Sequence, residues 1–265
     1  MNLELRQIEM YNYIKERTEV SVATLAQQFG VSQVTIRRTL KRLEDAGLVN
    51  HAYGKANIAD TSRTESTFRE RVNINPVGKH KMAEIAQQYI ADTSIKSAYF
   101  DGSSSALEVI KLLPKNANMT IFTNSFSILL TLRDKPQIRT FFIGGFMDWN
   151  DLSTADITTE DQCKQIFVDA TFTSCGGFSE AGTFNNGYTG AQIRRIMMKN
   201  SLRNYLLADH TKYNNQGVFL LNTWDSIDVL ITDQELPLPF LDNMRMLNVD
   251  VQYSKSEAEA EVRPR

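Results

Sequence analysis

Residues 30–38 read GVSQVTIRR, and this stretch decides the fold of the first part of the chain. Ser32 is a typical N-cap, because its hydroxyl can accept a hydrogen bond from an N–H of the first helical turn. The apolar spacing that follows predicts a helix ending at Gly47, where a left-handed residue is favoured. The expected inward positions of this helix are Val34, Ile36, Leu40 and Leu43.

Two further helical patterns precede this helix, and a hairpin pattern follows it. The second pattern starts after a predicted N-cap, Ser21, and stops at Gly30. Residues 48–59 carry two short apolar runs around a polar turn, which predicts a β-hairpin. Together these patterns predict a winged helix-turn-helix domain over residues 1–60. The expected inward positions are Leu5, Ile8, Tyr11 and Ile14 in the first helix, and Val22, Leu25, Ala26 and Phe29 in the second.

The third predicted helix carries a local excess of positive charge. Residues 31–56 hold five basic residues against two acidic ones, a balance of +3 in a chain whose formal net charge is −2. A helix that enters the major groove needs short polar groups and cations near its start. A solvated surface is the alternative for the two arginines alone, but three helices and a wing favour DNA binding. The candidate DNA-binding residues are Ser32, Gln33, Thr35, Arg37, Arg38, Lys41 and Arg42 of the helix, with His51, Tyr53 and Lys55 of the wing.

Residues 22–48, VATLAQQFGVSQVTIRRTLKRLEDAGL, resemble the N-terminal domain of the DeoR family of sugar-metabolism regulators. The resemblance implies binding to double-stranded operator DNA. Two positions depart from the family pattern. Thr39 stands where the family usually has an aspartate, and residues 50–56, NHAYGKA, replace its usual Arg-x-His-Gly-Gly-Ala wing. These departures suggest an altered operator.

From residue 77 onward, short apolar runs alternate with helical stretches. This alternation predicts a mainly parallel sheet covered by helices, an α/β domain over residues 77–253. Residues 61–76 are polar and predict a connection between the domains, and residues 254–265 form a charged tail. The expected strands are 97–100, 119–122, 139–143, 170–173, 205–208 and 229–232.

Polar or glycine-rich turns follow several of these strands. Ligands of open α/β sheets bind outside the carboxyl ends of the strands, and the N–H groups at a helix N-terminus favour an anion such as phosphate. A lone serine in such a turn is more often only an N-cap, but four turns at one edge can converge on one ligand. The candidate effector-binding residues are Asp101, Gly102, Ser103, Ser104, Ser105, Thr123, Asn124, Ser125, Gly144, Gly145, Asp209 and Lys212.

These turns also resemble the effector domain of the DeoR family, whose fold is similar to ribose-phosphate isomerases and coenzyme A transferases. The resemblance then covers about residues 1–232 and implies a phosphorylated sugar as effector. One departure concerns a helix before Asp209, where many members carry a glutamate and, six positions later, a lysine. Thr189 and Arg195 occupy those positions here, which suggests a different ligand contact.

Composition excludes several other classes of protein. The net charge of −2 does not fit a general polyanion binder, and no run of 18 apolar residues predicts a membrane span. Cys163 and Cys175 and the three scattered histidines show no metal-ligand spacing. We therefore expect a cytoplasmic protein without a cofactor, a metal site or catalytic residues.

The leading hypothesis is a repressor of sugar or polyol catabolism genes, controlled by a phosphorylated sugar and assembled as a homodimer or homotetramer. Paired half-sites would supply the specificity that one small winged domain lacks. The alternative is a sugar-phosphate isomerase-like enzyme with an appended DNA-binding module. Asp101 and Asp209 would be its candidate bases. A metal-sensing repressor is a third possibility, which the scattered histidines disfavour.

Overall fold

The computed structural model describes residues 10, 13–14, 17, 19–45, 49–52, 54–58, 66–93, 95–185, 190–217 and 219–254. The chain divides into two compact units, Met1–Glu65 and Ser66–Arg265. The first contains the helix-turn-helix elements and the second a parallel sheet with helices, which confirms the predicted fold class. Within the described ranges, no helix has both the length and the apolar character needed to cross a membrane.

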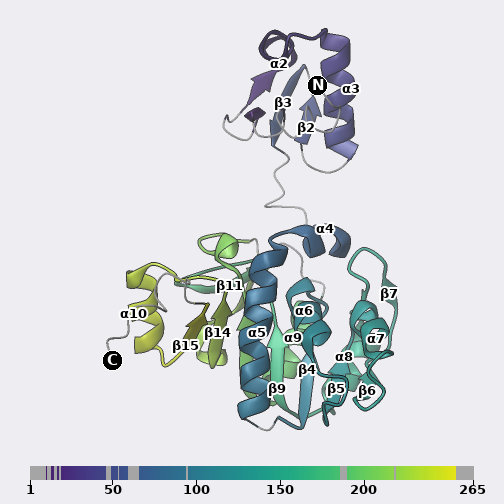
Figure 1. Ribbon diagram of the computed structural model, residues 1–265, viewed down its shortest axis with the longest axis vertical. Coiled ribbons are helices and arrows are strands. Elements are labelled where there is room, and N and C mark those ends of the chain that lie inside the picture. Colours follow the sequence, from purple (N-terminus) through teal and green to yellow (C-terminus); the bar gives the residue numbers. More distant parts are fainter. Residues whose placement is uncertain are drawn as a thin grey trace, which may run out of the picture. The chain divides into compact units, whose positions relative to one another are not determined.

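Among the residues that the structure describes, the first unit packs the helices Val22–Phe29 and Gln33–Asp45 on a three-stranded antiparallel sheet of order β1-β3-β2 (Figure 1). The Ser21 hydroxyl caps the first of these helices by accepting from the Thr24 N–H at 3.0 Å, and Gly30 ends it with φ 61°. The sequence predicted both of these boundaries. The elements are β1 (Val20–Ser21), α2 (Val22–Phe29), α3 (Gln33–Asp45), β2 (Val49–Ala52) and β3 (Lys55–Ile58).

The core of this unit confirms most of the predicted inward positions, with one error. Val34 was predicted to face inward, but its side chain is 72% exposed. It lies two residues before the buried Ile36, on the side of α3 away from the core. Strand β1 was not predicted, and Leu5, Ile8 and Tyr11 lie outside the described residues. The core consists of Met10, Ile14, Val20, Val22, Leu25, Ile36, Leu40, Leu43, Val49 and Ala56.

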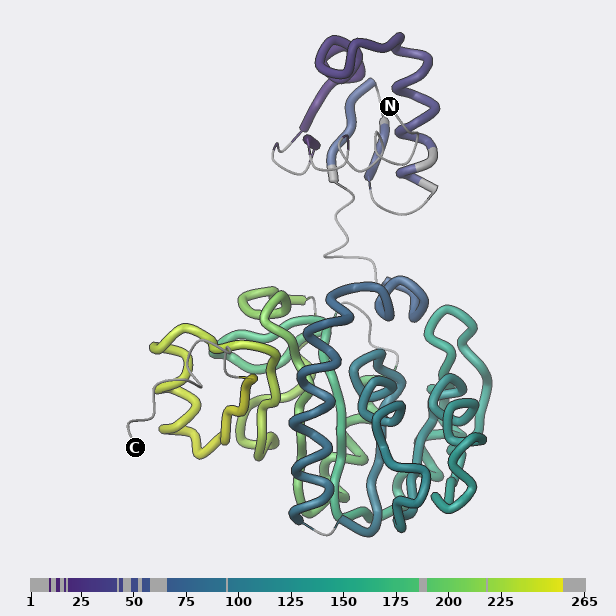
Figure 2. Tube along the Cα trace, in the orientation of Figure 1, coloured from purple at the N-terminus to yellow at the C-terminus, as the bar shows by residue number. Residues whose placement is uncertain are grey.

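The second unit is built on a seven-stranded parallel sheet of order β15-β14-β12-β9-β4-β5-β6. Its strands are β4 (Ser97–Phe100), β5 (Thr120–Thr123), β6 (Arg139–Phe142), β9 (Val168–Thr173), β12 (Ser201–Leu207), β14 (Val229–Thr232) and β15 (Asp250–Tyr253). Six of the seven coincide with predicted strands, and β15 was missed. Figure 2 shows β15 and the C-terminal part of the chain at one edge of this sheet and β6 at the other.

Neighbouring residues of a strand point to opposite sides of the sheet. Both faces therefore carry apolar side chains, and helices cover both. Phe100 packs in the layer that contains α5 and α6, whereas Tyr99 packs in the layer that contains α8 and α9. The helices are α4 (Phe68–Asn73), α5 (Pro76–Asp92), α6 (Ser104–Leu112), α7 (Phe126–Leu132), α8 (Ile157–Cys163), α9 (Ala191–Lys199) and α10 (Leu238–Met246), with the 3-10 turns η1 (His210–Lys212) and η2 (Trp224–Ser226).

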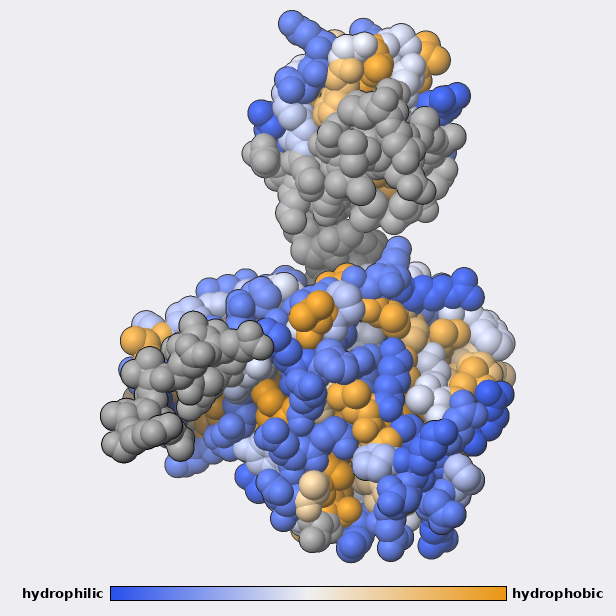
Figure 3. Space-filling view, viewed as in Figure 1, coloured by the Kyte–Doolittle hydropathy of each residue, from blue (hydrophilic) through white to orange (hydrophobic). Residues whose placement is uncertain are grey.

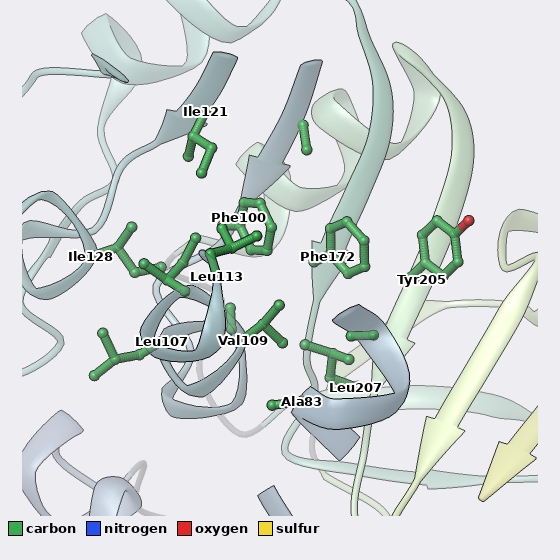
Figure 4. Packing of buried hydrophobic residues seen from close by; sticks show 14 of the residues in the cluster. Ala83, Phe100, Leu107, Val109, Leu113, Ile121, Ile128, Phe172, Tyr205 and Leu207 are labelled. Carbon is green, nitrogen blue, oxygen red and sulfur yellow. The ribbon is translucent and has the colours of Figure 1, made fainter. Parts of the chain in front are cut away.

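Three aromatic rings stack across the middle of the sheet (Figure 4). Phe100, Phe172 and Tyr205 are register partners on β4, β9 and β12. The ring centroids are 4.8 Å apart in the first pair and 4.7 Å in the second, with the planes within 9° of parallel. This spacing is that of neighbouring strands, so the stack follows directly from the register. It joins the three strands whose carboxyl ends carry the candidate ligand site.

Short antiparallel strands decorate the same unit. A hairpin pairs β7 (Met147–Asp148) with β8 (Ser153–Thr154), and a small sheet contains β10 (Gly177–Ser179), β11 (Gly182–Asn185) and β13 (Phe219–Asn222). None of these was predicted. On the face drawn in Figure 3, the second unit is mostly hydrophilic, and its hydrophobic side chains form separate small areas.

Part of the segment 61–76, predicted as a connection, is folded. Residues 66–76 contain α4 and the start of α5, and the Phe68 ring is buried in the core of the second unit. A reciprocal capping box between Thr67 and Glu70 starts α4. The predicted tail from residue 255 onward lies outside the described residues.

Candidate DNA-binding surface and ligand site

One side of α3 is exposed and carries most of the predicted DNA-binding residues. Its exposed side chains are Gln33, Val34, Arg37, Arg38 and Lys41. The intervals of four and one residues between them place them on one side of the helix, opposite the buried Ile36 and Leu40. Guanidinium groups suit guanine edges and phosphates, and an exposed valine suits a thymine methyl group. The surface can therefore read bases with both polar and apolar contacts.

The start of α3 is fixed by the predicted cap. The Ser32 hydroxyl accepts from the Thr35 N–H at 3.2 Å and lies 3.0 Å from the Thr35 hydroxyl. Thr39, which replaces the aspartate usual in the resembled family, is buried and donates to the Thr35 carbonyl at 3.0 Å. Its side chain is therefore a packing group of the helix, and not part of the exposed surface.

The wing is tied to the rest of the first unit by charged groups. Lys55 forms an ion pair with Glu19 at 2.6 Å. The Glu44 carboxylate accepts from the His51 N–H at 3.3 Å, and hydrogen bonds from Lys41 and His51 lower the pKa of Glu44. Of the other predicted contacts, Tyr53 and the side chain of Arg42 lie outside the described residues.

In the second unit, Asp101 is the centre of a buried hydrogen-bond network. It follows β4, and one of its carboxylate oxygens accepts from the Ser103 N–H at 3.1 Å. The other accepts from the Ser174 N–H at 3.0 Å and lies 3.4 Å from an Arg194 nitrogen. The carboxylate therefore joins the carboxyl ends of β4 and β9 to helix α9.

Lys212 reaches the same network from the far side. Its ammonium donates to the Ser174 hydroxyl at 2.9 Å, and that hydroxyl donates to the Leu207 carbonyl at 2.6 Å. Ser174 thus connects Asp101, Lys212 and the end of β12 across the central strands. The structure brings together two of the predicted turns here, the one at residue 101 and the one at residue 209.

Three polar atoms in or near this network are buried and have no hydrogen-bond partner in the described part of the chain. They are Arg194 Nε, the Ser105 hydroxyl, in the first turn of α6, and one carboxylate oxygen of Asp209. The other Asp209 oxygen caps η1 by accepting from the Thr211 N–H at 3.1 Å. Buried polar groups are normally paired, so these three atoms indicate a place where a polar ligand can bind.

Lys79 is a buried cation that was not among the predicted ligand-binding residues. Its side chain comes from α5 and is only 4% exposed. The ammonium donates to the backbone carbonyls of Arg71 and Ile74. Burial and then the nearby Lys212 ammonium lower the pKa of Lys79 to about 8, while the charge of Asp209 raises it. Lys79 therefore lies beside the predicted residues at the end of β12.

Asp233 holds the N-terminus of α5 against the end of β14. It accepts from the Asn75 side chain at 3.0 Å and from the His210 N–H at 2.8 Å. These hydrogen bonds and the His210 ring lower the pKa of Asp233, although burial opposes the shift. The hydrogen-bonded side chains of Asn75 and Asp233 explain why residue 78 is a glycine, because a Cβ at Gly78 would clash with both of them.

The predicted turn after β5 is buried, and its side chains are satisfied inside the protein. Thr123 donates to the Phe100 carbonyl, and Ser125 caps α7. Asn124 bridges the Tyr99 hydroxyl at 2.9 Å and the Thr154 carbonyl at 2.6 Å. The turn therefore supports the neighbouring strand ends, and its hydrogen bonds are directed at the protein.

Gly144 and Gly145 follow the edge strand β6, two strands away from β4. The Gly144 carbonyl accepts from Thr159 and Gln162 of α8. A Cβ at Gly145 would lie 2.2 Å from the Thr159 hydroxyl. Gly102, in contrast, lies in the turn at Asp101, where a Cβ would press on Ser153 at 3.1 Å. The hydrogen bonds of Gly144 thus connect it to α8, whereas Gly102 belongs to the central network.

Three residues of the network were missed, although the sequence held a signal for each. Ser174 directly follows a predicted strand, as Asp101 does. Lys79 shares a helical face with Met82, Ala83 and Ala86, which is an unusual place for a lysine. Arg194 likewise shares a face with Ala191 and Met198.

The departure from the family pattern at Arg195 has a structural explanation, because its guanidinium donates to the carbonyls of Leu220 and Leu221. Thr189 lies outside the described residues.

Both units match models of one protein family. Residues 6–62 match the DeoR-like helix-turn-helix domain, and residues 74–234 match the DeoR C terminal sensor domain.

In the described ranges, no three His, Cys, Asp or Glu side chains are placed to share a metal ion.

Relatives in three bacteria are similar over most of their length. The HTH-type transcriptional regulator GolR of Listeria innocua is 26% identical, with 87% of this chain and 91% of that protein covered. The L-fucose operon activator of Haemophilus influenzae is 26% identical, with 85% and 90% covered. A putative aga operon transcriptional repressor of Escherichia coli O157:H7 is 24% identical, with 93% and 92% covered. All three are named as regulators of transcription, so the isomerase-like alternative is not favoured.

Solved structures are similar over part of the chain. Ribose 5-phosphate isomerase A from Methanocaldococcus jannaschii is 17% identical with a TM-score of 0.38, and covers 53% of this chain and 56% of its own. The translation initiation factor eIF-2B of Pyrococcus horikoshii is 13% identical with a TM-score of 0.40, and covers 75% and 66%. The family models together cover both units, and the chain belongs to the DeoR family of transcriptional regulators.

Proposed function

We propose that this protein is a repressor of sugar or polyol catabolism genes whose affinity for operator DNA is controlled by a phosphorylated sugar. The sugar phosphate binds at the carboxyl edge of the parallel sheet in the second unit. The observation that carries this proposal is the set of hydrogen-bond partners of Lys79 and Lys212. Among the described residues, both ammonium groups hydrogen-bond only to neutral groups, the carbonyls of Arg71 and Ile74 and the Ser174 hydroxyl.

Lys79 is buried and Lys212 is half-buried, and neither ammonium hydrogen-bonds to a carboxylate in the described residues. Cations in such surroundings favour an anionic ligand. A phosphate group provides two negative charges and several acceptor oxygens, which suit two ammonium groups and the N–H groups that open α6. The buried Asp209 oxygen and the Ser105 hydroxyl, which lack partners in the described residues, suit the hydroxyl groups of a sugar. The same edge thus provides contacts for both parts of a sugar phosphate.

The DNA-binding half of the proposal is supported by the exposed side of α3. The repressor role takes support from the putative aga operon repressor, which is similar along 93% of this chain. A reporter gene placed behind a DNA sequence selected by the protein from a random pool tests this role. We expect expression to rise when the regulator is deleted, and a fall in expression would identify an activator instead.

Lys212→Ala is expected to weaken sugar-phosphate binding by about tenfold to a hundredfold, because one charge-assisted hydrogen bond contributes about 1.5–3 kcal/mol. Isothermal titration calorimetry with a panel of ribose 5-phosphate, fructose 6-phosphate, glucose 6-phosphate and glycerol 3-phosphate measures the effect. Lys164→Ala is the matched control, because that lysine is exposed and pairs with Asp161. Equal affinities of the Lys212 variant and the parent would place the phosphate elsewhere.

The affinity for a sugar phosphate is expected to fall as the pH rises above about 8. The pKa of Lys79 is about 8 without ligand, and a neighbouring phosphate raises it by favouring the ammonium form. Binding is therefore strongest below pH 8 and weakens by up to about tenfold per pH unit until the ligand-bound pKa is reached. The charged groups that influence Lys79 are Lys212, Asp209, Arg71 and Glu108. Calorimetry between pH 7 and 9.5 measures the change. In Lys79→Gln the slope should vanish, and a flat profile in the parent would contradict the assignment.

We also expect a homodimer or homotetramer that assembles through the second unit. This unit exposes several large apolar side chains, among them Phe146, Trp149, Leu202 and Met246. Paired half-sites give a small winged domain the specificity of a longer DNA sequence. Light scattering after size exclusion measures the mass. A monomeric mass together with full DNA affinity would contradict this expectation.

A further inference from the structure

The C-terminal end of α4 is held by two residues of the candidate ligand site. The Arg71 carbonyl accepts from the Lys79 ammonium and from the Ser104 hydroxyl, the latter at 3.2 Å. The Ile74 carbonyl accepts from Lys79 as well. Lys79 and Ser104 are both buried, and they come from α5 and α6. Backbone carbonyls at the end of a helix lack the usual N–H partner four residues on. The Arg71 carbonyl accepts from the Ile74 N–H at 3.3 Å, and the two side chains add to this hydrogen bond.

The N-terminal end of α4 is fixed independently of the ligand site. Phe68 is buried in the core, and its N–H donates to the Asn150 carbonyl at 2.8 Å. The capping box of Thr67 and Glu70 lies at this end, with the Thr67 N–H donating to the Glu70 carboxylate at 2.7 Å. Only the C-terminal end of α4 therefore depends on groups that can also bind a ligand. As the first helix of the second unit, α4 follows the residues that connect this unit to the first.

We propose that a bound phosphate and the C-terminal end of α4 compete for Ser104 and Lys79, and that this competition carries the ligand signal toward the DNA-binding unit. The inference rests on the proposed function and assigns its regulation to named atoms. The Ser104 hydroxyl has one hydrogen, so it can donate to the Arg71 carbonyl or to a phosphate oxygen, but not to both.

Lys79 reinforces the competition through its charge. A phosphate attracts the ammonium more strongly than a neutral carbonyl does, since charge-assisted hydrogen bonds are about twice as strong as neutral ones. Binding thus removes the Ser104 hydrogen bond from α4 and draws Lys79 toward the ligand. The end of α4 then loses partners, and a segment with fewer hydrogen bonds opens more often.

Hydrogen exchange of the α4 amides tests this inference, with inorganic phosphate as the probe because only the anionic group is involved. Phosphate is compared with chloride at equal ionic strength. In the parent we expect phosphate to speed the exchange of residues 68–74 by about fivefold, which corresponds to the loss of one hydrogen bond of about 1 kcal/mol. In Ser104→Ala the exchange should already be fast, and phosphate should add little.

Two matched variants separate this role from a general loss of packing. Ser226→Ala removes a serine hydroxyl that donates to the Thr223 carbonyl at 2.8 Å, in η2 before β14 and outside the candidate ligand site, so its α4 should respond to phosphate as the parent does. Lys79→Gln keeps a side chain with N–H donors but carries no charge, so it should bind phosphate more weakly, and α4 should need a higher phosphate concentration for the same increase in exchange.

The coupling between ligand and DNA gives a second readout. Typical allosteric coupling changes an affinity by about 5–150-fold. We expect the ratio of DNA affinities with and without a binding sugar phosphate to fall to about one in Ser104→Ala and to be kept in Ser226→Ala. A parent-like ratio in Ser104→Ala, or α4 exchange that ignores phosphate in the parent, would overturn the inference. If no sugar phosphate of the panel binds the parent, the proposed function itself fails.

Discussion

Replacing both Arg37 and Arg38 by alanine is expected to weaken binding to the preferred DNA sequence by about 100-fold or more. Both guanidinium groups lie on the exposed side of α3, whereas Ile36 and Leu40 face the core. One base-edge contact contributes about 1–3 kcal/mol, so two contacts together contribute about 2–6 kcal/mol, and a loss of about 3 kcal/mol already corresponds to about 100-fold. Fluorescence anisotropy with DNA selected from a random pool measures this effect, and circular dichroism checks that the variant is folded.

Lys55→Ala is the matched control for a charge that lies away from the helix. Lys55 is exposed, lies in the wing and pairs with Glu19. Its loss should weaken all DNA sequences to a similar extent and make the affinity less sensitive to salt, as expected for a phosphate contact. If the double arginine variant bound the DNA with the affinity of the parent, α3 would not be the DNA-recognition helix.

Phe172→Ala is expected to destabilise the second unit by about 3–5 kcal/mol, which is the usual cost of removing a buried phenylalanine ring. Phe172 is fully buried and stacks between Phe100 and Tyr205. Its removal leaves a cavity between three central strands and ends both ring contacts. Urea unfolding followed by tryptophan fluorescence reports on this unit alone, because the two tryptophans of the chain, Trp149 and Trp224, both lie in it.

Phe167→Ala provides the comparison for this experiment. Phe167 precedes the same strand, but its ring is 73% exposed. A surface substitution of this kind usually changes the free energy of unfolding by less than about 0.5 kcal/mol. A loss of less than about 1 kcal/mol in Phe172→Ala would contradict the packing described for the centre of the sheet.

Local signals in the sequence were enough to predict the boundaries of α2, the cap of α3 and six of the seven parallel strands. Each of these features depends on residues close together in the chain. The Ser21 and Ser32 caps accept from N–H groups three residues away, and Gly30 ends α2 as predicted, with a left-handed backbone. Buried parallel strands form short apolar runs between turns, so Ser97–Phe100 and Val229–Thr232 could be placed without knowledge of their neighbours.

The errors arose where a residue's role depends on distant parts of the chain. Val34 is apolar and fits the helical spacing, but its exposure follows from which side of α3 meets the rest of the domain. Asn124 stays a predicted ligand contact, but its hydrogen bonds with Tyr99 and Thr154 could not be predicted from the sequence. Lys79 could be connected to Lys212 only through the fold, because 133 positions separate them in the sequence.

Asp101 illustrates how far the sequence could define the candidate site. Its position after a strand placed it at the carboxyl edge, as predicted from the general behaviour of α/β sheets. Its partners Ser174 and Arg194 come from other strands and helices, and their approach depends on the strand order β12-β9-β4. A strand order of this kind is set by packing over the whole unit, so no local pattern could provide it.

The most direct test of the central claim is the DNA affinity of the full-length protein with and without sugar phosphates. Fluorescence anisotropy with the selected DNA sequence is recorded in the presence of each member of the panel and of the corresponding compound without phosphate. We predict that at least one sugar phosphate changes the Kd for DNA by about tenfold or more and that its unphosphorylated counterpart has no effect. In Lys212→Ala, a higher concentration of the same sugar phosphate should be needed for the same change in Kd. A Kd for DNA that stays the same with every sugar phosphate, in a protein that binds the DNA tightly, would contradict the claim.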